Sequence, residues 1–429
     1  LMLTDSFPII DVNALKGLSY PGAAYTVLKG FVNDIPGDVL KSLIEKSYAA
    51  FSDPLVVPVK DVKECLLAEL FHGPTYAFKD VALQLLGNLF EYILTESSEK
   101  LNIVGATSGD TGSAAIAGVR GKKNVNIAIL YPDGKVSPVQ ERQMATVPDA
   151  NVHTYAVEGT FDDCQNIVKA LFADVPFKKA HQLGAVNSIN WARIMSQIVY
   201  YFYAYVQSGI EGKANFVVPT GNFGNIFAAW AAKEMGLPVE KLVIATNEND
   251  ILHRFVATGD YSLSKAVPTH SPSMDIQISS NLERFLFYIY KDCDKLKTAM
   301  EQLKEKGRIA FSDIELAAVK SVFDSYAVSN TATEEAIKRV YERCGYIMDP
   351  HTACAVEAAF QLKLDPARTI AMSTAHPAKF PAVVNKALGF EPEPPAGIKA
   401  LDGLPLRRNL AANSVDKFKE IVAAMDAGA

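Results

Sequence analysis

The chain has 429 residues, of which 49% are hydrophobic and 21% are charged, and its net charge is −6. This size and composition are typical of a globular enzyme with two or three domains. The sequence has no lysine- and arginine-rich block that would indicate a nucleic-acid partner. It also has no apolar run near the ~20 residues that a membrane span needs, so we expect neither nucleic acid nor membrane as a partner.

The cysteines and histidines indicate neither a disulfide framework nor a metal. The five cysteines are scattered without a C-x-x-C pair, and the seven histidines lack ligand spacing. We therefore expect reduced thiols, a cytoplasmic location and no metal site. The chain starts at Leu1 without an initiator Met or a secretory pattern, which is compatible with a truncated or processed N-terminus.

Residues 1–60 are predicted to form an N-terminal appendage. They are mixed in composition and contain one short amphipathic helix, from Val39 to Phe51. No catalytic motif is recognisable in them.

A polar turn leads into a long apolar helix at Lys79. The helix repeats apolar residues every four positions, at Val81, Leu85, Leu89 and Ile93. It is therefore predicted to be buried. The helix dipole and desolvation both disfavour a cation in the first turn, and both lower the pKa of the Lys79 amine. A neutral amine suits a Schiff-base lysine, whereas this stretch alone is more typical of a lysine that reaches solvent from a helix end.

Two runs of alternating strands and helices follow. Strands are predicted at 101–107, 124–131, 151–157, 215–219, 241–246 and from 368 to about 373. This alternation predicts an α/β fold with parallel-rich twisted sheets flanked by helices. Residues 250–345 are interpreted as mostly helical and polar, and residues 391–397 as a stiff linker to a short C-terminal tail.

Two of the predicted strands end in loops that suit an anion. Thr107–Gly112 offers hydroxyls and backbone amides before a helix, and Gly221–Asn225 offers two glycines that allow close backbone approach. Each loop, taken singly, is equally compatible with a plain tight turn between strand and helix.

Two further polar clusters stand beside apolar elements. Asn187–Arg193 opens a long apolar helix, and its arginine suits either a structural carboxylate or a substrate phosphate. Ser373–Lys379 places hydroxyls at the carboxyl end of a strand, where open α/β sheets bind ligands, although a helix cap is the simpler interpretation. A candidate Schiff-base lysine with anion loops matches the needs of pyridoxal phosphate.

The order of these motifs resembles the threonine synthase family, which belongs to the fold type II pyridoxal-phosphate enzymes. The resembling segments are His72–Asp80, Thr107–Gly112, Lys135–Gln140, Pro219–Asn225 and Ser373–Phe380, with Asn187–Arg193 also similar. The resemblance implies an N-terminal appendage at 1–60, a large cofactor-binding domain at 61–95 and 185–429, and a small mobile α/β domain at 96–184. A homodimer is common in this cofactor class.

By this resemblance, Lys79 carries pyridoxal phosphate as a Schiff base and serves as general base and acid, with Phe78 beside it in the cofactor site. The cofactor phosphate would be bound by Gly221, Asn222, Phe223, Gly224 and Asn225. Thr374 would meet the pyridine nitrogen with a hydroxyl, and Asp110 would lie on the O3′ side of the cofactor.

The resemblance also implies the substrate contacts and the reaction. Thr107, Ser108 and Thr111 would face the substrate carboxylate, and Asn187, Ser188 and Arg193 would hold its phosphate. The implied enzyme is a carbon–oxygen lyase acting on a phosphate ester. It would convert O-phospho-L-homoserine and water into L-threonine and phosphate by γ-elimination and β-addition, the last step of threonine biosynthesis.

Other activities remain open at this point. A threonine synthase-like phospho-lyase acting on O-phosphothreonine is the nearest alternative, but such relatives tend to depart at the glycine loop and at Ser373–Phe380, which are intact here. A threonine or serine dehydratase would have no use for a second phosphate site, and an inactive scaffold would not need Lys79 with every surrounding motif.

Overall fold

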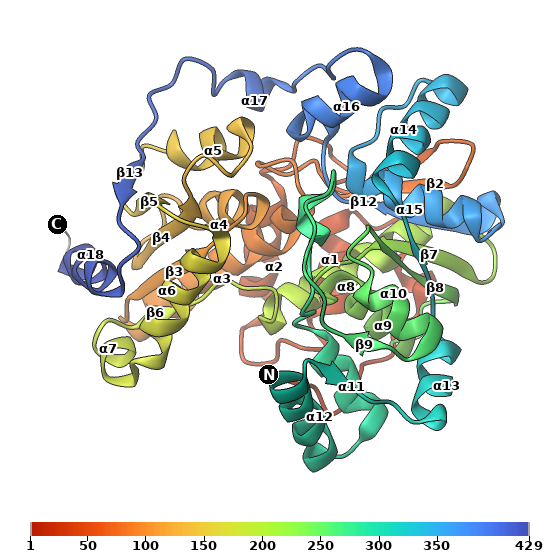
Figure 1. Cartoon of the computed structure of the whole chain (residues 1–429), viewed down its shortest axis with the longest axis horizontal. Helices are drawn as coiled ribbons and strands as arrows, with labels where there is room; N and C mark the ends of the chain where they lie inside the picture. Colours follow the sequence, from red (N-terminus) through yellow and green to blue (C-terminus); the bar gives the residue numbers. More distant parts are fainter. Residues whose placement is uncertain (1, 428–429) are drawn as a thin grey trace. The chain divides into compact units, whose positions relative to one another are not determined.

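The protein is described by a computed structural model covering residues 2–427, which form two compact units (Figure 1). The large unit comprises residues 2–41, 53–72 and 188–392, and the small unit comprises residues 42–52, 73–187 and 393–427. These boundaries differ from those expected. The Lys79 helix and the C-terminal tail fall in the small unit, and the first 41 residues fall in the large one.

A six-stranded sheet forms the centre of the large unit. Its order is β1 (Val59–Asp61), β2 (Leu66–Glu69), β12 (Thr369–Ser373), β7 (Ala214–Pro219), β8 (Val239–Thr246) and β11 (Phe323–Ala327). Only β1 pairs antiparallel, with β2, and the other neighbours are parallel. The predicted parallel-rich sheet is thus confirmed, and β11, from a stretch interpreted as helical, extends it.

Helices cover both faces of this sheet. The helices of this unit, which lie on the sheet or pack on the helices that do, are α1 (Tyr20–Leu28), α8 (Trp191–Ser208), α9 (Gly224–Glu234), α10 (Ile251–Thr258), α11 (Leu282–Tyr290), α12 (Cys293–Lys306), α13 (Asp313–Val322), α14 (Asn330–Cys344), α15 (Pro350–Gln361) and α16 (Pro381–Leu388). Along β7, Val217 packs in a cluster with α15, while the ring of Phe216 meets Tyr201 of α8. Alternate side chains of a strand point to opposite faces, so every residue of β7 is buried. A two-stranded ribbon of β9 (Tyr261–Ser262) and β10 (Arg308–Ile309) lies outside the sheet.

The first residues of the chain belong to the core of the large unit. Helix α1 packs against α8, and the ring of Tyr20 meets Tyr203 edge-on at 5.0 Å. These residues were expected to form an appendage because their pattern shows no strong period. The helix predicted at 39–51 is α2 (Gly37–Tyr48), whose second half lies in the small unit.

The small unit is built on a five-stranded parallel sheet, whose last strand, β13 (Asn409–Ala411), is blue in Figure 1. Its order is β13, β5 (Val152–Val157), β4 (Val125–Pro132), β3 (Leu101–Ala106) and β6 (Leu183–Gly184). Its helices are α3 (Lys79–Ser97), α4 (Asp110–Val119), α5 (Pro138–Ala145), α6 (Phe161–Ala173), α7 (Val175–Ala180), α17 (Ala396–Lys399) and α18 (Val415–Ala427). The helices predicted after Lys79, Gly112 and Thr160 are all present.

The C-terminal tail is an integral part of this unit. Strand β13 pairs with β5, and α18 buries Phe418 and Val422 in one cluster with α6 and the sheet. The expectation of a short tail after a stiff linker was wrong, because a three-residue strand is too short to show a period. The tail completes the sheet and covers one of its faces.

Helix α3 packs closely on α4 through two glycines. A side chain at Gly87 would run into the backbone of Gly118, and one at Gly118 into the backbone of Leu83. This close approach buries Val81, Leu85 and Leu89 as predicted, whereas Ile93 is 49% exposed, contrary to the predicted stripe.

The Gly87–Gly118 contact predicts a large effect on stability. We expect Gly87→Ala to lower the free energy of unfolding by about 3 kcal/mol, because an overpacked side chain meets rigid backbone. The matched control is Gly22→Ala in α1, where the nearest atoms lie at 3.5 Å. Thermal unfolding followed by circular dichroism compares the two variants, and equal melting temperatures would contradict the close helix contact.

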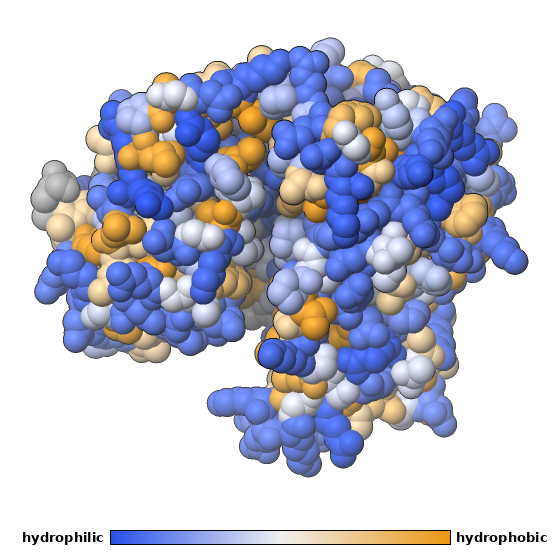
Figure 2. All heavy atoms as spheres, turned by 45° about the horizontal axis from the view of Figure 1, so that its top comes forward, coloured by the Kyte–Doolittle hydropathy of each residue, from blue (hydrophilic) through white to orange (hydrophobic). Residues whose placement is uncertain are grey.

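The surface is mostly hydrophilic on the face shown in Figure 2, with hydrophobic residues scattered among polar ones. None of the helices formed by residues 2–427 combines the length and hydropathy required of a membrane span.

Candidate active site

The residues predicted to form the site divide between the two units. The small unit carries Phe78, Lys79, Thr107, Ser108, Asp110, Thr111 and Asn187, and the large unit carries Ser188, Arg193, 221–225 and Thr374. Each group is described within its own unit.

Lys79 lies at the first position of α3 and pairs with Asp110, the first residue of α4. Both are buried, with 8% and 5% exposure, and Lys79 Nζ lies 3.2 Å from Asp110 Oδ2. Lys79 Nζ also lies 5.0 Å from the ring centre of Phe78. The other carboxylate oxygen of Asp110 accepts a hydrogen bond from Gln140 Nε2 at 2.9 Å. The structure therefore brings the predicted lysine and aspartate together. The Asp110 carboxylate is held between Lys79 on one oxygen and Gln140 on the other.

The turn before Lys79 is folded over the start of α3. Thr75 donates to the Asp80 carboxylate from its backbone N at 2.8 Å and from its hydroxyl at 2.7 Å. A side chain at Gly73 would collide with Asp80, so only glycine fits there. Gln143 Nε2 donates to the Thr75 carbonyl at 3.0 Å. These contacts hold the backbone that carries Lys79 in one conformation.

The loop Thr107–Gly112 is held in its turn by the side chain of Thr107. The Thr107 hydroxyl accepts from the backbone N of Gly109 at 3.0 Å and of Gly112 at 2.9 Å. Thr107 thus shapes the turn that starts α4. Ser108 is exposed and Thr111 is half-buried at the same turn. Asn187, the last residue of the segment 73–187 of the small unit, is exposed.

In the large unit, the glycine loop and Thr374 follow neighbouring strands. Ile370 of β12 pairs with Phe216 of β7 and Ala371 pairs with Val217, so the chain continues at matching positions into Thr374 and Thr220. Parallel sheets bind ligands at this carboxyl edge. Thr374 is 6% exposed there.

His376, two residues after Thr374, is not a proton donor at this edge of the sheet. Its ring packs edge-on against Phe71 at 5.4 Å. Burial lowers the pKa of His376 to about 4, so the imidazole is neutral at physiological pH.

The glycine loop is braced by the segment before α11. Ser279 Oγ donates to the Gly221 carbonyl at 2.7 Å, and Asn281 donates twice to the Asn222 carbonyl. Ser280 Oγ lies 2.9 Å from Ser188 Oγ and donates to Asn222 Oδ1. The structure therefore brings Ser188 and the loop together through Ser280.

The loop enters α9 through Phe223 in a left-handed conformation. Phe223 has φ +63° and is 1% exposed, with its ring against Phe285 and Phe323. Such a conformation is costly for a residue with a side chain and persists where packing enforces it. It directs the chain into α9 at Gly224. The amides of the first turn have no partner within the helix and suit an anion.

Asn225 in that turn has a buried amide group in need of an acceptor. Its Nδ2 is fully buried and has no hydrogen-bond partner within residues 2–427. A buried unpaired donor is unfavourable, and an anion at the start of α9 would satisfy it. The donors present therefore fit a phosphate group.

Arg193 is the second buried group in need of an anion. It is 3% exposed on α8, and its Nε and Nη1 have no partner within residues 2–427. Burial lowers the pKa of its guanidinium to about 10. The described part of the chain gives Arg193 no ion pair with a carboxylate, which decides against the structural alternative considered above. A buried cation without a counter-charge suits a ligand phosphate.

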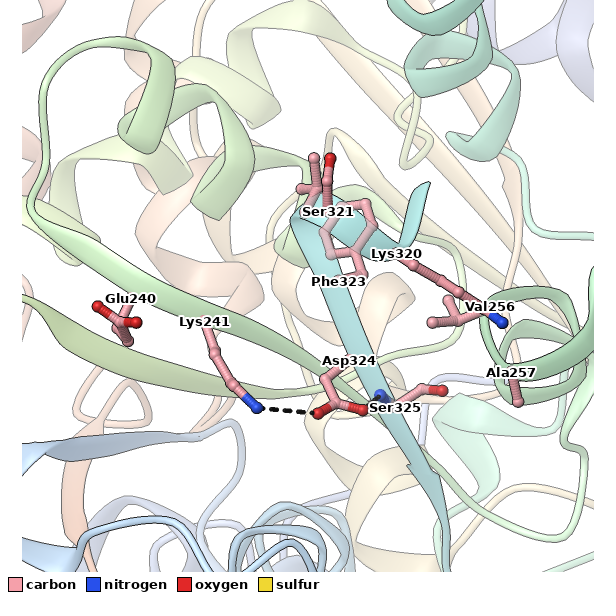
Figure 3. A pocket seen from close by; sticks show the side chains of 10 residues that line it. Glu240, Lys241, Val256, Ala257, Lys320, Ser321, Phe323, Asp324 and Ser325 are labelled. Carbon is pink, nitrogen blue, oxygen red and sulfur yellow. Dashed lines mark hydrogen bonds and ion pairs between the residues drawn. The ribbon is translucent and has the colours of Figure 1, made fainter. Parts of the chain in front are cut away.

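A groove of about 490 Å³ at the opposite edge of the sheet is separate from these residues (Figure 3). It lies at the amino ends of β8 and β11, and Lys241 bridges to Asp324 across it at 3.4 Å. None of the predicted site residues lines this groove. The groove therefore takes no part in the candidate active site.

Several residues that support the site were given no role from the sequence. Gln140 and Gln143 are three positions apart on α5, and Tyr200 and Tyr201 contact Asn225 from α8. For Gln140 a signal existed, since Ser137 and Gln140 form a capping box. The tyrosines looked like ordinary core residues of an apolar helix.

Comparison with known proteins places the chain in a family. Residues 60–373 match the family described as "Pyridoxal-phosphate dependent enzyme", and residues 352–422 match "Threonine synthase, C-terminal". Threonine synthase from Schizosaccharomyces pombe is 48% identical over 417 residues, which cover 88% of this chain and 81% of that protein. The solved structure of pyridoxal-phosphate-bound threonine synthase from Brucella melitensis is 43% identical, with a TM-score of 0.96 and coverage of 99% and 93%.

A relative with a different name is less similar. Threonine synthase-like 2 from Homo sapiens is 36% identical over 419 residues, which cover 94% of this chain and 86% of that protein. The stronger similarity to threonine synthases does not favour the phospho-lyase alternative. The chain belongs to the threonine synthase family of pyridoxal-phosphate-dependent enzymes.

Proposed function

We propose that this protein converts O-phospho-L-homoserine and water into L-threonine and phosphate. The observation that carries the choice of substrate is Arg193, a buried guanidinium with two unpaired nitrogens, which is separate from the loop 221–225 that we assign to the cofactor phosphate. A phosphorylated amino acid would supply the missing counter-charge. A substrate without a phosphate would leave Arg193 buried and unpaired.

We assign the cofactor contacts residue by residue. Lys79 would hold the aldehyde carbon, with Phe78 and Asp110 next to the lysine. The loop 221–225 would hold the phosphate, which suits the unpaired Asn225 Nδ2 and the close packing around Gly221, where a side chain would meet the Ser273 carbonyl at 2.9 Å. Thr374 would contact the ring nitrogen. When bound, pyridoxal phosphate supplies an electron sink that stabilises negative charge developing at the substrate's Cα.

Lys79 would move the protons of the reaction. Released from the cofactor, its amine would take the proton from Cα and then one from Cβ, and phosphate would leave from Cγ. One proton would return to Cγ, the hydroxyl of water would add to Cβ, and a second proton would return to Cα to give threonine. Asp110, held by Gln140, would keep the amine oriented between these steps.

Two sets of residues would bind the substrate. Arg193, Ser188 and Asn187 would hold its phosphate. The hydroxyls and amides of the loop with Thr107, Ser108 and Thr111 would hold its carboxylate. This arrangement would fix the Cα–H bond relative to Lys79, which is a contribution from positioning and not from acid–base strength.

Parallel assays with two phosphate esters test the proposed substrate. With O-phospho-L-homoserine, we expect equimolar phosphate and threonine. With O-phospho-L-threonine, we expect kcat/KM at least about a hundredfold lower, since binding that is not matched to the transition state loses several kcal/mol. Release of phosphate with 2-oxobutyrate from phosphothreonine, and no threonine from phosphohomoserine, would reverse the assignment in favour of a phospho-lyase.

We further propose a cytoplasmic location and a homodimer. All five cysteines are free thiols in the structure, as suits a reducing compartment. We propose the homodimer because dimers are common among enzymes of this cofactor class.

A further inference from the structure

Two adjacent tyrosines of α8 meet at the side chain of Asn225. Tyr200 and Tyr201 are both fully buried, and their rings lie 5.0 Å apart. Tyr200 Oη lies 2.5 Å from Asn225 Oδ1. Tyr201 Oη lies 2.7 Å from the same atom and 3.0 Å from the Asn225 carbonyl oxygen. One amide oxygen is thus approached by two hydroxyls.

The short distances identify the side of the amide that faces the tyrosines. Hydrogen bonds between two oxygens cluster near 2.7 Å, and those from an amide nitrogen near 2.9–3.0 Å. Burial raises the pKa of both phenols well above their usual range, so each hydroxyl keeps its proton and donates. The Asn225 oxygen is therefore the acceptor on this side, and its NH₂ is left on the other.

If the Asn225 side-chain amide were turned round, its NH₂ would face the two tyrosines. Tyr200 could then give its proton to Gln197 Oε1 at 3.2 Å, and Tyr201 could give its proton to the Asn225 carbonyl. The amide oxygen would then take the place of Nδ2 and present a lone pair to an anion at the loop. Because both hydroxyls lie within 2.7 Å of the Asn225 oxygen and donate to it, the NH₂ is the group that Asn225 offers on the other side.

We propose that Tyr200 and Tyr201 are positioning residues that hold the Asn225 NH₂ toward the cofactor phosphate, and so make the loop selective for the phosphorylated aldehyde. This inference rests on the proposed place of the phosphate at residues 221–225. It goes beyond that placement because it assigns phosphate selectivity to two residues on a different helix. Neither tyrosine touches the cofactor in this account.

Titration of the apoenzyme with pyridoxal phosphate and with pyridoxal separates phosphate binding from aldehyde binding. Dissociation constants come from the visible absorbance of the bound ligand. For the double variant Tyr200→Phe/Tyr201→Phe, we expect the affinity for pyridoxal phosphate to fall about tenfold or more, since a hydrogen bond to a charged group is lost. We expect the affinity for pyridoxal to change less than about twofold, because pyridoxal has no phosphate.

Two further variants make the result decisive. Tyr203→Phe removes another buried hydroxyl from the same helix, where the ring packs on Tyr20, and it should leave both affinities unchanged. Asn225→Asp keeps the acceptor for the tyrosines but replaces the unpaired NH₂ with an oxygen, and it should weaken only pyridoxal phosphate binding.

The outcomes distinguish the inference from the placement on which it rests. If Asn225→Asp weakens pyridoxal phosphate selectively and the double tyrosine variant does not, the phosphate lies at the loop and the role of the tyrosines is overturned. If Asn225→Asp changes neither affinity, the placement of the phosphate fails as well. Equal losses for both ligands in the double variant would show a general loss of structure and also overturn the inference.

Discussion

Replacing Lys79 by alanine is expected to lower kcat for threonine formation by about 10⁴-fold, because one amine both binds the cofactor and transfers the protons. The variant should also lose the visible absorbance of cofactor bound through a Schiff base. Steady-state assays and absorbance spectra of the purified protein measure the two effects together.

Lys79→Arg is the matched control for this prediction. Arginine keeps the positive charge next to Asp110, which the lysine contacts at 3.2 Å, but it forms no Schiff base. We expect Lys79→Arg to be as inactive as Lys79→Ala but to unfold at a higher temperature, since the alanine leaves a buried carboxylate without its cation. An arginine variant that keeps a tenth of the activity would show that Lys79 acts only as a charge.

Arg193→Met is expected to separate binding from stability. Loss of a buried charge that pairs with a ligand phosphate costs about 2–5 kcal/mol, so kcat/KM for O-phosphohomoserine should fall by at least about 30-fold. The ligand-free variant should nevertheless be more stable than the unchanged protein. Thermal unfolding without phosphate or sulfate in the buffer measures this gain.

The sign of the stability effect follows from the lowered pKa of Arg193. A buried guanidinium with a pKa of about 10 carries its charge at neutral pH in both folded and unfolded chains, so its desolvation destabilises the folded protein fully there. The lowering corresponds to roughly 3 kcal/mol. That penalty is relieved only as the pH rises above about 10, where the folded protein begins to lose the proton first.

Arg284 provides the control for Arg193. It is also fully buried, but its guanidinium donates to the carbonyls of Met2 and Ile189 and to the side chain of Asn281. Arg284→Met should therefore lower the melting temperature, in contrast to Arg193→Met. Added inorganic phosphate should stabilise the unchanged protein more than the Arg193 variant, because the variant keeps only the anion site at the loop 221–225. A lower melting temperature for Arg193→Met in the absence of anions would show that Arg193 has a structural partner.

The sequence predicted those parts of the fold whose signals are local. The helix that begins at Lys79, the turns at Thr107–Gly112 and Gly221–Asn225, and the strands before them are all recognisable from short windows of residues. Glycines and capping residues mark such turns because only certain side chains fit their backbone angles. The candidate lysine and Asp110 are brought together because each opens a helix beside the other.

Features that depend on packing between distant segments were not predictable in this way. The tail strand β13 has three residues, and its place beside β5 depends on a segment far earlier in the chain, since Asn409 pairs with Tyr155. Ile93 continues the four-residue apolar repeat yet is half exposed, while Leu94 beside it is buried, because a spacing of four residues drifts around a helix with 3.6 residues per turn. Tyr200 and Tyr201 match an ordinary apolar helix, and only their distances to Asn225 reveal a polar role.

The most direct test of the proposed reaction uses water labelled with ¹⁸O and O-phospho-L-homoserine. Elimination of phosphate by cleavage of the Cγ–O bond, followed by addition of water to Cβ, predicts threonine with ¹⁸O in its hydroxyl and phosphate without label. Mass spectrometry of both products reads the outcome in a single reaction. Homoserine as the product, or ¹⁸O in the phosphate, would indicate simple hydrolysis of the ester and contradict the proposed function.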